Sequence, residues 1–133
     1  MRVVVLDASA ALLLLIDPGE PGERVAARLA GAAVVAPDLL PHEVTNVLRR
    51  HRNAGRLSEA EAQLALTGFH ALTIELWPQA VLSKRVWTLG GNLSAYDAAY
   101  VALAERLDGV LLTADARLAA APGVACEVEV VPM

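Results

Sequence analysis

The sequence is poor in cysteine and in aromatic residues, and it lacks both a basic excess and a membrane-length apolar segment. Its single cysteine, Cys126, excludes an internal disulfide and any metal site built from several thiolates. Aromatic residues make up only 4% of the 133 residues, so the core must be built from Ala, Leu and Val. No segment approaches the roughly 18 consecutive apolar residues of a membrane span, because Asp7 interrupts the first apolar run. We therefore expect a cytoplasmic protein that does not enter a membrane.

The charge balance gives no support for a broad basic surface of the kind that binds nucleic acid by charge alone. The chain carries 15 acidic and 11 basic residues, and its formal net charge is −4. The candidate site residues equal this excess in number, since they are the four acids Asp7, Glu43, Asp97 and Asp115. Carboxylates gathered at one site need a hard cation to offset their repulsion.

The hydrophobic pattern predicts an α/β fold. Short apolar runs alternate with segments of helical period, which favours a mostly parallel sheet of about five strands flanked by helices. No linker or internal repeat interrupts the chain, so residues 1–133 are expected to form one domain. Strands are expected at residues 3–6, 34–36, 73–77, 110–113 and 127–131. Helices are expected at residues 10–16, 20–29, 38–54, 59–72, 79–89, 95–107 and 116–120.

The four acids fall at equivalent places in this pattern. Asp7 and Asp115 each follow a predicted strand, so a parallel sheet brings both to the same edge. Glu43 and Asp97 fall in the first turns of helices that begin at that edge. Each acid alone is explained equally well as a helix cap or as a charge that complements a helix dipole. As a set, we expect them to gather within a few ångströms around Asp7, where their repulsion calls for protonation or a bound cation.

An all-carboxylate site suits Mg²⁺ or Mn²⁺, which prefer oxygen ligands and keep bound waters. No histidine or cysteine has the spacing of a zinc site. The matching chemistry is phosphoryl transfer or phosphodiester hydrolysis by a metal-activated water. Ser9, Asn46 and Thr113 are placed to support the acids, although each is also explained as a cap or an ordinary satisfied polar residue.

Four segments of the chain resemble the PIN domain, most closely the toxin ribonucleases of VapBC toxin–antitoxin pairs. These segments are LDASAALLLL, PHEVTNVL, LSAYDAAYVALAE and LLTADARLA, in the order and at the separations typical of that family. The resemblance implies a metal-dependent endoribonuclease that uses one or two Mg²⁺ or Mn²⁺ ions. It also implies that Asp7 and Asp97 bind metal directly, and that Glu43 and Asp115 act partly through water.

Arginines are the candidates for RNA contact. Many members of the family carry a further acid just after the fourth, but this chain has Arg117 there. The second metal site is therefore in question, and Arg117 either meets a phosphate or forms a surface ion pair. Arg49 and Arg52 begin about two turns beyond Glu43, roughly 10 Å along the helix. Cations near a helix C-terminus also complement its dipole, which is the alternative explanation.

The resemblance also implies partners, namely a second copy of the chain and an antitoxin whose helical tail fills an apolar groove. The apolar residues at 11–16 and 25–29 exceed what a small monomer needs, in agreement with both. Two other functions are considered. A metal-dependent phosphatase or receiver domain needs acidic or lysine motifs that this chain lacks. A catalytically silent PIN-like interaction module, whose acids only cap helices, stays open.

Overall fold

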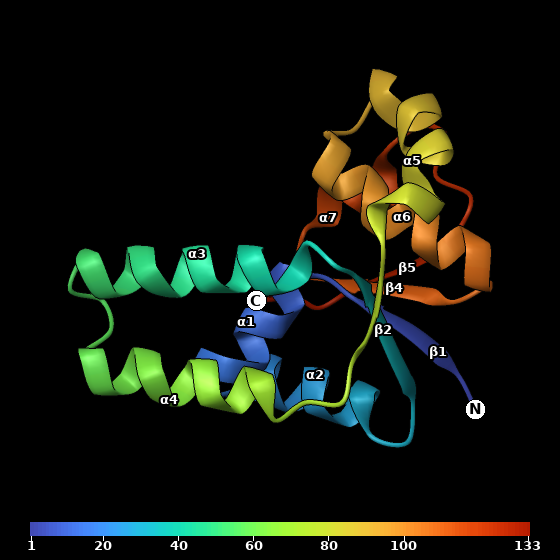
Figure 1. Cartoon of the computed structure of the whole chain (residues 1–133). Helices are drawn as coiled ribbons and strands as arrows, with labels where there is room; N and C mark the ends of the chain where they lie inside the picture. The colour runs from blue at the N-terminus through green and yellow to red at the C-terminus, as the bar shows by residue number, and fades with distance from the viewer.

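Five short strands form a fully parallel sheet at the centre of the computed structural model, which describes residues 1–133 (Figure 1). The predicted α/β class and the predicted number of strands are confirmed. The strands lie in the order β3-β2-β1-β4-β5, so the first strand of the chain is central. They span Val3–Leu6 (β1), Ala33–Pro37 (β2), Glu75–Trp77 (β3), Val110–Thr113 (β4) and Glu127–Val130 (β5).

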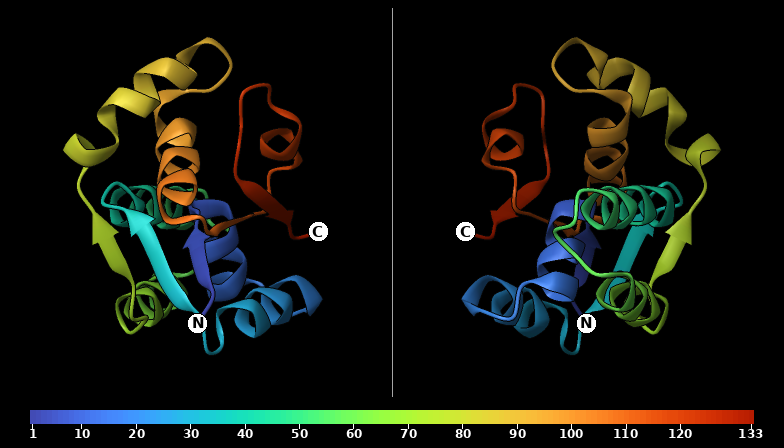
Figure 2. Two further views of the ribbon diagram at one scale, coloured as in Figure 1. Left: turned by 90° about the vertical axis from the view of Figure 1, so that its right-hand side faces the viewer. Right: turned by 90° about the vertical axis from the view of Figure 1, so that its left-hand side faces the viewer.

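Helices cover both faces of this sheet. The connections from β1 to β2 and from β2 to β3 advance in one direction, and those to β4 and β5 run in the other. Right-handed crossovers therefore place α1–α4 on one face and α5–α7 on the opposite face (Figures 1 and 2). The helices span Ala8–Ile16 (α1), Glu20–Leu29 (α2), Leu40–Asn53 (α3), Glu59–His70 (α4), Gln79–Thr88 (α5), Ala95–Leu107 (α6) and Ala116–Ala120 (α7), with a short 3₁₀ turn (η1) at Leu89–Gly91.

Several predicted boundaries were wrong by one or two residues, each for a local reason. Helix α1 begins at Ala8 rather than residue 10, because the Asp7 side chain caps it. Helix α3 begins at Leu40 rather than residue 38, and no side chain caps its start. Strand β3 is shorter than expected because β2 pairs with it only over the three residues 75–77. The helix expected to end at residue 89 instead passes into the 3₁₀ turn.

Helix α6 is the most deeply buried helix and contacts β1, β2 and β4. Its residues 98–104 are all buried, and four of these seven are alanines, which lets the helix lie close to the sheet. Cys126 is half-buried against the core, and burial raises the pKa of its thiol to about 11. None of the helices combines the length and apolarity needed to cross a membrane.

The contact between α1 and α2 depends on Gly22. A Cβ at this position would lie 2.1 Å from the carbonyl oxygen of Asp17 and 2.8 Å from that of Leu13. Backbone atoms cannot move aside as the end of a flexible side chain can. We therefore expect Gly22→Ala to lower the free energy of unfolding by about 2–3 kcal/mol, the upper part of the range for overpacked cores, as measured by urea titration.

Gly90 supplies the matched control, because a Cβ added there meets no atom within 4 Å. Gly90→Ala is expected to change the urea midpoint little. Equal midpoints for the two alanine variants would show that α1 and α2 do not approach as closely as described.

Candidate active site

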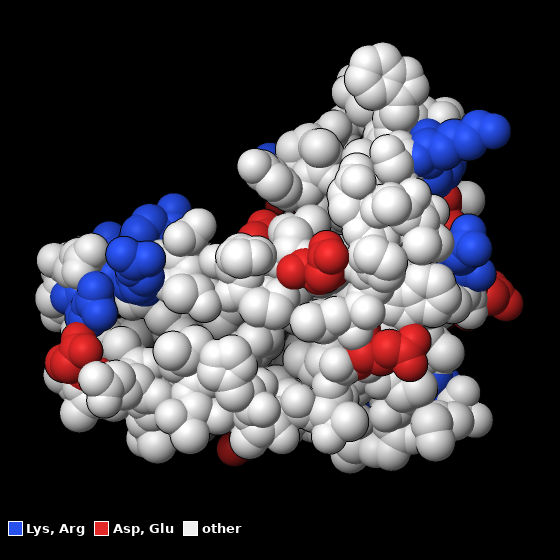
Figure 3. Space-filling view, in the orientation of Figure 1, with Lys and Arg blue, Asp and Glu red and all other residues white.

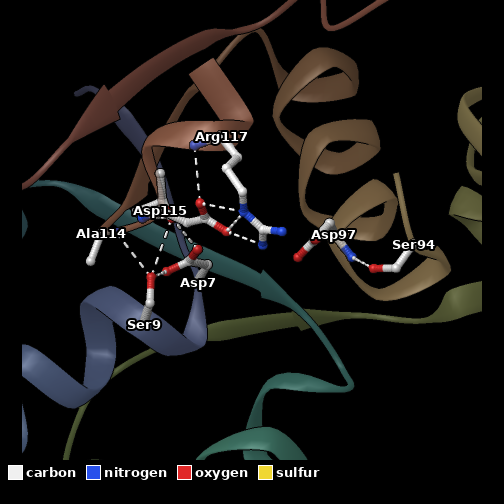
Figure 4. Close-up of polar contacts among 8 residues, drawn as sticks. Asp7, Ser9, Ser94, Asp97, Ala114, Asp115 and Arg117 are labelled. Carbon is white, nitrogen blue, oxygen red and sulfur yellow. Dashed lines mark hydrogen bonds and ion pairs between the residues drawn. The ribbon is translucent and has the colours of Figure 1, made fainter. Parts of the chain in front are cut away.

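The four acids singled out from the sequence lie at one edge of the sheet, where the strands end. Strands β1 and β4 are neighbours, and Asp7 and Asp115 follow them. The chain leaves β1 toward β2 on one side and reaches β4 on the other, so this is the point where the strand order reverses. Open α/β sheets place their ligand sites at such a point. Figure 4 shows Asp7, Asp97 and Asp115 around this position.

Asp7 is a buried carboxylate whose contacts are all with neutral groups. Only 6% of the residue is exposed. Its Oδ1 accepts hydrogen bonds from the Ser9 hydroxyl at 2.7 Å and from the Ala10 backbone N–H at 2.9 Å. Its Oδ2 accepts a hydrogen bond from the Thr113 hydroxyl. No lysine or arginine forms an ion pair with it.

The electrostatic consequence is a carboxyl group that resists ionisation. Burial raises the pKa of Asp7, and the nearby charge of Asp97 adds to this effect, although the three hydrogen bonds oppose it. A buried negative charge without a cation is costly, and proteins usually pair such a charge or neutralise it. Asp7 therefore sits in an environment that a bound cation would relieve.

Glu43 lies in the first turn of α3 and is held from across the sheet edge by Tyr100 of α6. The Tyr100 hydroxyl donates a hydrogen bond to Glu43 Oε1. Burial raises the pKa of Glu43, and the charges of Asp7 and Asp97 add to it, although the hydrogen bond from Tyr100 opposes the change. Burial, followed by the bond to Glu43, raises the pKa of Tyr100 as well. The Tyr100 hydroxyl therefore keeps its proton at neutral pH and donates a hydrogen bond.

The carboxylate of Asp97 has no partner within the protein. The Ser94 hydroxyl caps α6 by accepting the Asp97 backbone N–H at 3.1 Å, which fixes the first turn of the helix. No protein group hydrogen-bonds to the side-chain oxygens of Asp97, and no ion pair involves them. Among the four acids, this is the one whose side chain is free to bind a ligand.

Asp115 is engaged by its own neighbour. The Arg117 guanidinium contacts both carboxylate oxygens, with Nη2 at 2.6 Å from Oδ2 and Nε at 3.0 Å from Oδ1 (Figure 4). The Arg117 side chain holds the pKa of Asp115 below its usual value. Of the two alternatives considered for Arg117, a phosphate contact or an ion pair, the structure contains the ion pair.

The expectation that four carboxylates converge within a few ångströms was wrong. No three acidic, histidine or cysteine side chains lie close enough together to hold one ion as a group. Three of the acids instead have partners of their own: Thr113 and Ser9 contact Asp7, Tyr100 contacts Glu43, and Arg117 contacts Asp115. Mg²⁺ nevertheless needs only one or two carboxylates and retains several waters. The all-oxygen donor set and the cation-free burial of Asp7 fit such an ion.

Of the other residues predicted for the site, two contact Asp7 and three form no hydrogen bond or ion pair with the four acids. Ser9 and Thr113 both contact Asp7, and Thr113 also accepts the Asp115 backbone N–H at 3.0 Å. Asn46 is exposed on α3 and makes no hydrogen bond to Glu43. Arg49 is exposed and forms no ion pair, whereas Arg52 lies 3.5 Å from a carboxylate oxygen of Glu59.

Tyr100 was missed in the sequence, where it looks like one apolar residue of a buried helix. A local feature of the sequence could have identified this residue, because a tyrosine buried among alanines needs a partner for its hydroxyl. Tyr100 lies one turn after Asp97, which points to the site. Its acceptor, Glu43, is 57 residues away, and no sequence pattern identifies that pair.

The surface around the site is divided by charge. Arginine side chains gather over the C-terminal end of α3, which carries Arg50, His51 and Arg52 in its last turn (Figure 3). Acidic side chains lie in the hollow between α3 and the upper helices (Figure 3). The positive end of α3 and the negative sheet edge are thus adjacent on one face.

Comparisons with known proteins show which proteins this chain is similar to in sequence and in fold. A family model of the PIN domain matches residues 4–124. A VapC ribonuclease of Mycobacterium bovis is 39% identical over 130 residues, covering 98% of this chain and 99% of the relative. The solved structure of VapC20 from Mycobacterium tuberculosis, described as a sarcin–ricin loop cleaving toxin, has a TM-score of 0.70 at 18% identity and covers 97% of this chain and 99% of its own. VapBC2 from Rickettsia felis, solved with a promoter DNA fragment, has a TM-score of 0.68 at 11% identity, with coverage of 98% and 100%.

Proposed function

Because the chain belongs to the PIN-domain family, we propose that it is a metal-dependent endoribonuclease acting as the toxin of a toxin–antitoxin pair. Residues 1–133 serve as one nuclease domain in the cytoplasm. One observation carries the proposal: Asp7 is buried without a lysine or arginine partner at the sheet edge where the strand order reverses, and the free carboxylate of Asp97 lies near it.

Asp7 and Asp97 are the direct ligands of one Mg²⁺ or Mn²⁺ in this proposal, and Glu43 acts from farther away. When bound, the ion supplies a water of lowered pKa as the nucleophile and offsets charge at the phosphate. Asp115 is less available, since Arg117 occupies both of its oxygens. A second ion would have to displace that guanidinium.

The chain's own residues prepare this site. Ser9 and Thr113 hold the Asp7 carboxylate in one orientation, so little rearrangement is needed when an ion arrives. Tyr100 fixes Glu43 at Oε1, which leaves Oε2 free to accept a proton. The raised pKa of Glu43 makes it a better proton acceptor than an ordinary glutamate.

The antitoxin partner follows from the family and from an apolar groove next to the site. This groove of about 500 Å³ lies between α1 and α3 and is lined in part by Leu12, Ile16 and Val47. Ser9 also lines it, so a helical segment seated there would reach the neighbourhood of Asp7. The proposal includes a homodimer, with RNA as the substrate.

The alternative is a catalytically silent interaction module. In such a module the acids would only cap helices, as Asp7 does at α1, and a surface cap has no need of burial. The raised pKa values of Asp7 and Glu43 instead mark groups held in an unfavourable state, as catalytic groups often are. These two shifts favour the enzyme.

The test is RNA cleavage by the full chain purified free of partner proteins. Total RNA is expected to be cut with Mg²⁺ or Mn²⁺ and to stay intact with EDTA. Asp97→Asn is expected to lower the rate at least about 100-fold, since metal catalysis contributes several kcal/mol and each 1.4 kcal/mol is about tenfold. Asp108→Asn is the matched control, because Asp108 is exposed at the other end of the same helix with φ 51°, a conformation that asparagine tolerates.

Two outcomes would contradict the proposal. Equal cleavage by the Asp97→Asn and Asp108→Asn proteins would remove Asp97 from the site. Hydrolysis of p-nitrophenyl phosphate without any RNA cleavage would favour the phosphatase instead.

A further inference from the structure

A groove of about 640 Å³ runs along α3 from Leu39 to Asn53 and is lined by Glu43 among other residues. Glu43 lines its inner end, and Arg49, Arg50 and Asn53 line it farther along the helix. Tyr96, from the first turn of α6, forms the opposite wall. Among the four acids of the proposed site, Glu43 alone lines this groove, and it joins the groove to the edge of that site.

The arginines of this groove are free. Arg49 and Arg50 are exposed, and neither forms an ion pair or a side-chain hydrogen bond. Arg52, on the same helix, is in contrast paired with Glu59. From Glu43 to Arg50 is seven residues, or roughly 10 Å along the helix axis. A stacked strand carries one phosphate per about 3.4 Å, so this length matches about three nucleotides.

Tyr96 is one of the few aromatic residues of the chain, and its side chain is exposed beside the site. The chain has two Trp, two Tyr and one Phe. Phe69 and Tyr100 are buried in the core, whereas Tyr96 is 66% exposed and immediately precedes Asp97. An exposed aromatic ring beside a carboxylate site and two free guanidinium groups is the combination that binds single-stranded nucleic acid, since any base can stack on the ring.

A second groove lies on the other side of Asp97. It has a volume of about 440 Å³ and is lined by Ser94, Asp97 and Arg117, among others. Tyr96 and Asp97 are thus adjacent residues that face different grooves. An RNA strand that crosses the start of α6 would pass from one groove to the other, with one of its phosphates beside Asp97.

We propose that the groove along α3 is a subsite for an unpaired nucleotide of the RNA, with its base stacked on Tyr96 and the adjoining phosphates held by Arg49 and Arg50. This proposal rests on the proposed function and goes further, because it requires the substrate to be single-stranded beside the cleaved bond. A base within a duplex is already stacked on its neighbours and cannot lie against Tyr96. Asn46 and Asn53 line the same groove.

Binding is tested in the Asp7→Asn protein, which is expected to leave the RNA intact. The probe is a fluorescein-labelled 12-nucleotide oligoribonucleotide of mixed sequence, either single-stranded or annealed to its complement, and the readout is fluorescence anisotropy. We expect Tyr96→Ala to weaken single-strand binding about fivefold or more, and Tyr96→Phe to retain it, because stacking needs the ring and not the hydroxyl. Arg49→Gln and Arg50→Gln are each expected to reduce the slope of log affinity against log salt by about 0.7.

Trp87→Ala is the matched control, because Trp87 is an exposed aromatic residue outside the groove, 87% exposed on α5. Equal affinity of the Tyr96→Ala and Trp87→Ala proteins would overturn the subsite, as would equal binding of the duplex. So would a Tyr96→Ala protein that loses binding of its antitoxin while RNA binding is unchanged, because the groove would then serve the protein partner. If the wild-type chain cuts RNA in any of these cases, the subsite fails and the proposed function stands. If the wild-type chain does not cut RNA, the proposed function itself fails.

Discussion

The Asp7→Asn protein is expected to lose RNA cleavage by at least about 100-fold while folding at least as stably as the wild type. The loss follows from the proposed metal site, since an amide is a poor substitute for a carboxylate ligand and metal catalysis contributes several kcal/mol. The fold is preserved because asparagine has the same shape. Its oxygen can accept the bonds from Ser9 and Ala10, and its amide can donate to Thr113.

The stability of this variant follows from the raised pKa of Asp7. A carboxyl whose pKa is higher in the folded than in the unfolded protein binds its proton more tightly when folded. Its ionisation therefore opposes folding, in full above the folded pKa, and this loss of stability shrinks as the pH falls from the folded pKa to the unfolded pKa. Asparagine removes the charge at every pH, so the variant should have the higher Tm at neutral pH. The difference should narrow on acidification.

Glu23→Gln is the matched control, because Glu23 is exposed in the first turn of α2 and forms no ion pair. Thermal melts from pH 4 to pH 8 measure the stability, and cleavage of total RNA with Mn²⁺ measures the activity. A variant with a Tm well below that of the wild type at pH 7 would contradict the burial of an unpaired charge. Wild-type cleavage by the same variant would contradict the metal site.

The sequence predicts the features of this site that depend on adjacent residues, and it does not predict those that depend on distant contacts. An apolar run that is followed by an acid can be recognised from a few adjacent residues. This pattern occurs in RVVVLDAS and in LLTAD, and it predicts both strands and the sheet edge that they share. The direction of each side chain at that edge depends on its partner. Thr113 is 106 residues from Asp7, and no local pattern links the two.

Arg117 and Tyr100 illustrate the two kinds of missing information. The ion pair of Arg117 with Asp115 is a contact between residues two apart, and the sequence left it open as one of two alternatives. Tyr100 was missed because burial makes it look like core, and only its distant contact with Glu43 reveals it. The sequence thus predicted which acids share the edge, but wrongly predicted that they form one compact cluster.

Thr113→Val is expected to damage both stability and activity. The hydroxyl of Thr113 is fully buried, donates a hydrogen bond to Asp7 and accepts the Asp115 backbone N–H at 3.0 Å. Valine fills the same volume but leaves an Asp7 oxygen and that N–H without a partner. Each buried unsatisfied group costs about 1–3 kcal/mol, so the free energy of unfolding should fall by about 2–5 kcal/mol. Loss of a residue that orients a metal ligand should lower cleavage roughly 10–100-fold.

The loss of stability should itself depend on pH. The hydrogen bond from Thr113 lowers the pKa of Asp7 and partly offsets burial, so its removal raises that pKa further. The valine variant should therefore be most destabilised at a pH where Asp7 is ionised. It should approach the wild type as the pH falls and Asp7 takes up a proton in both proteins.

Thr113→Ser separates the hydroxyl from the methyl group. Serine keeps both hydrogen bonds and loses one buried methyl, which costs about 0.8 kcal/mol. Urea titrations at pH 5 and pH 8 should show a difference between the valine and wild-type proteins that grows with pH, and a serine variant whose smaller loss is the same at both values. If the valine and serine variants were equally stable and equally active, the hydroxyl would have no role in holding Asp7. The orientation of that carboxylate would then have to come from Ser9 and the start of α1 alone.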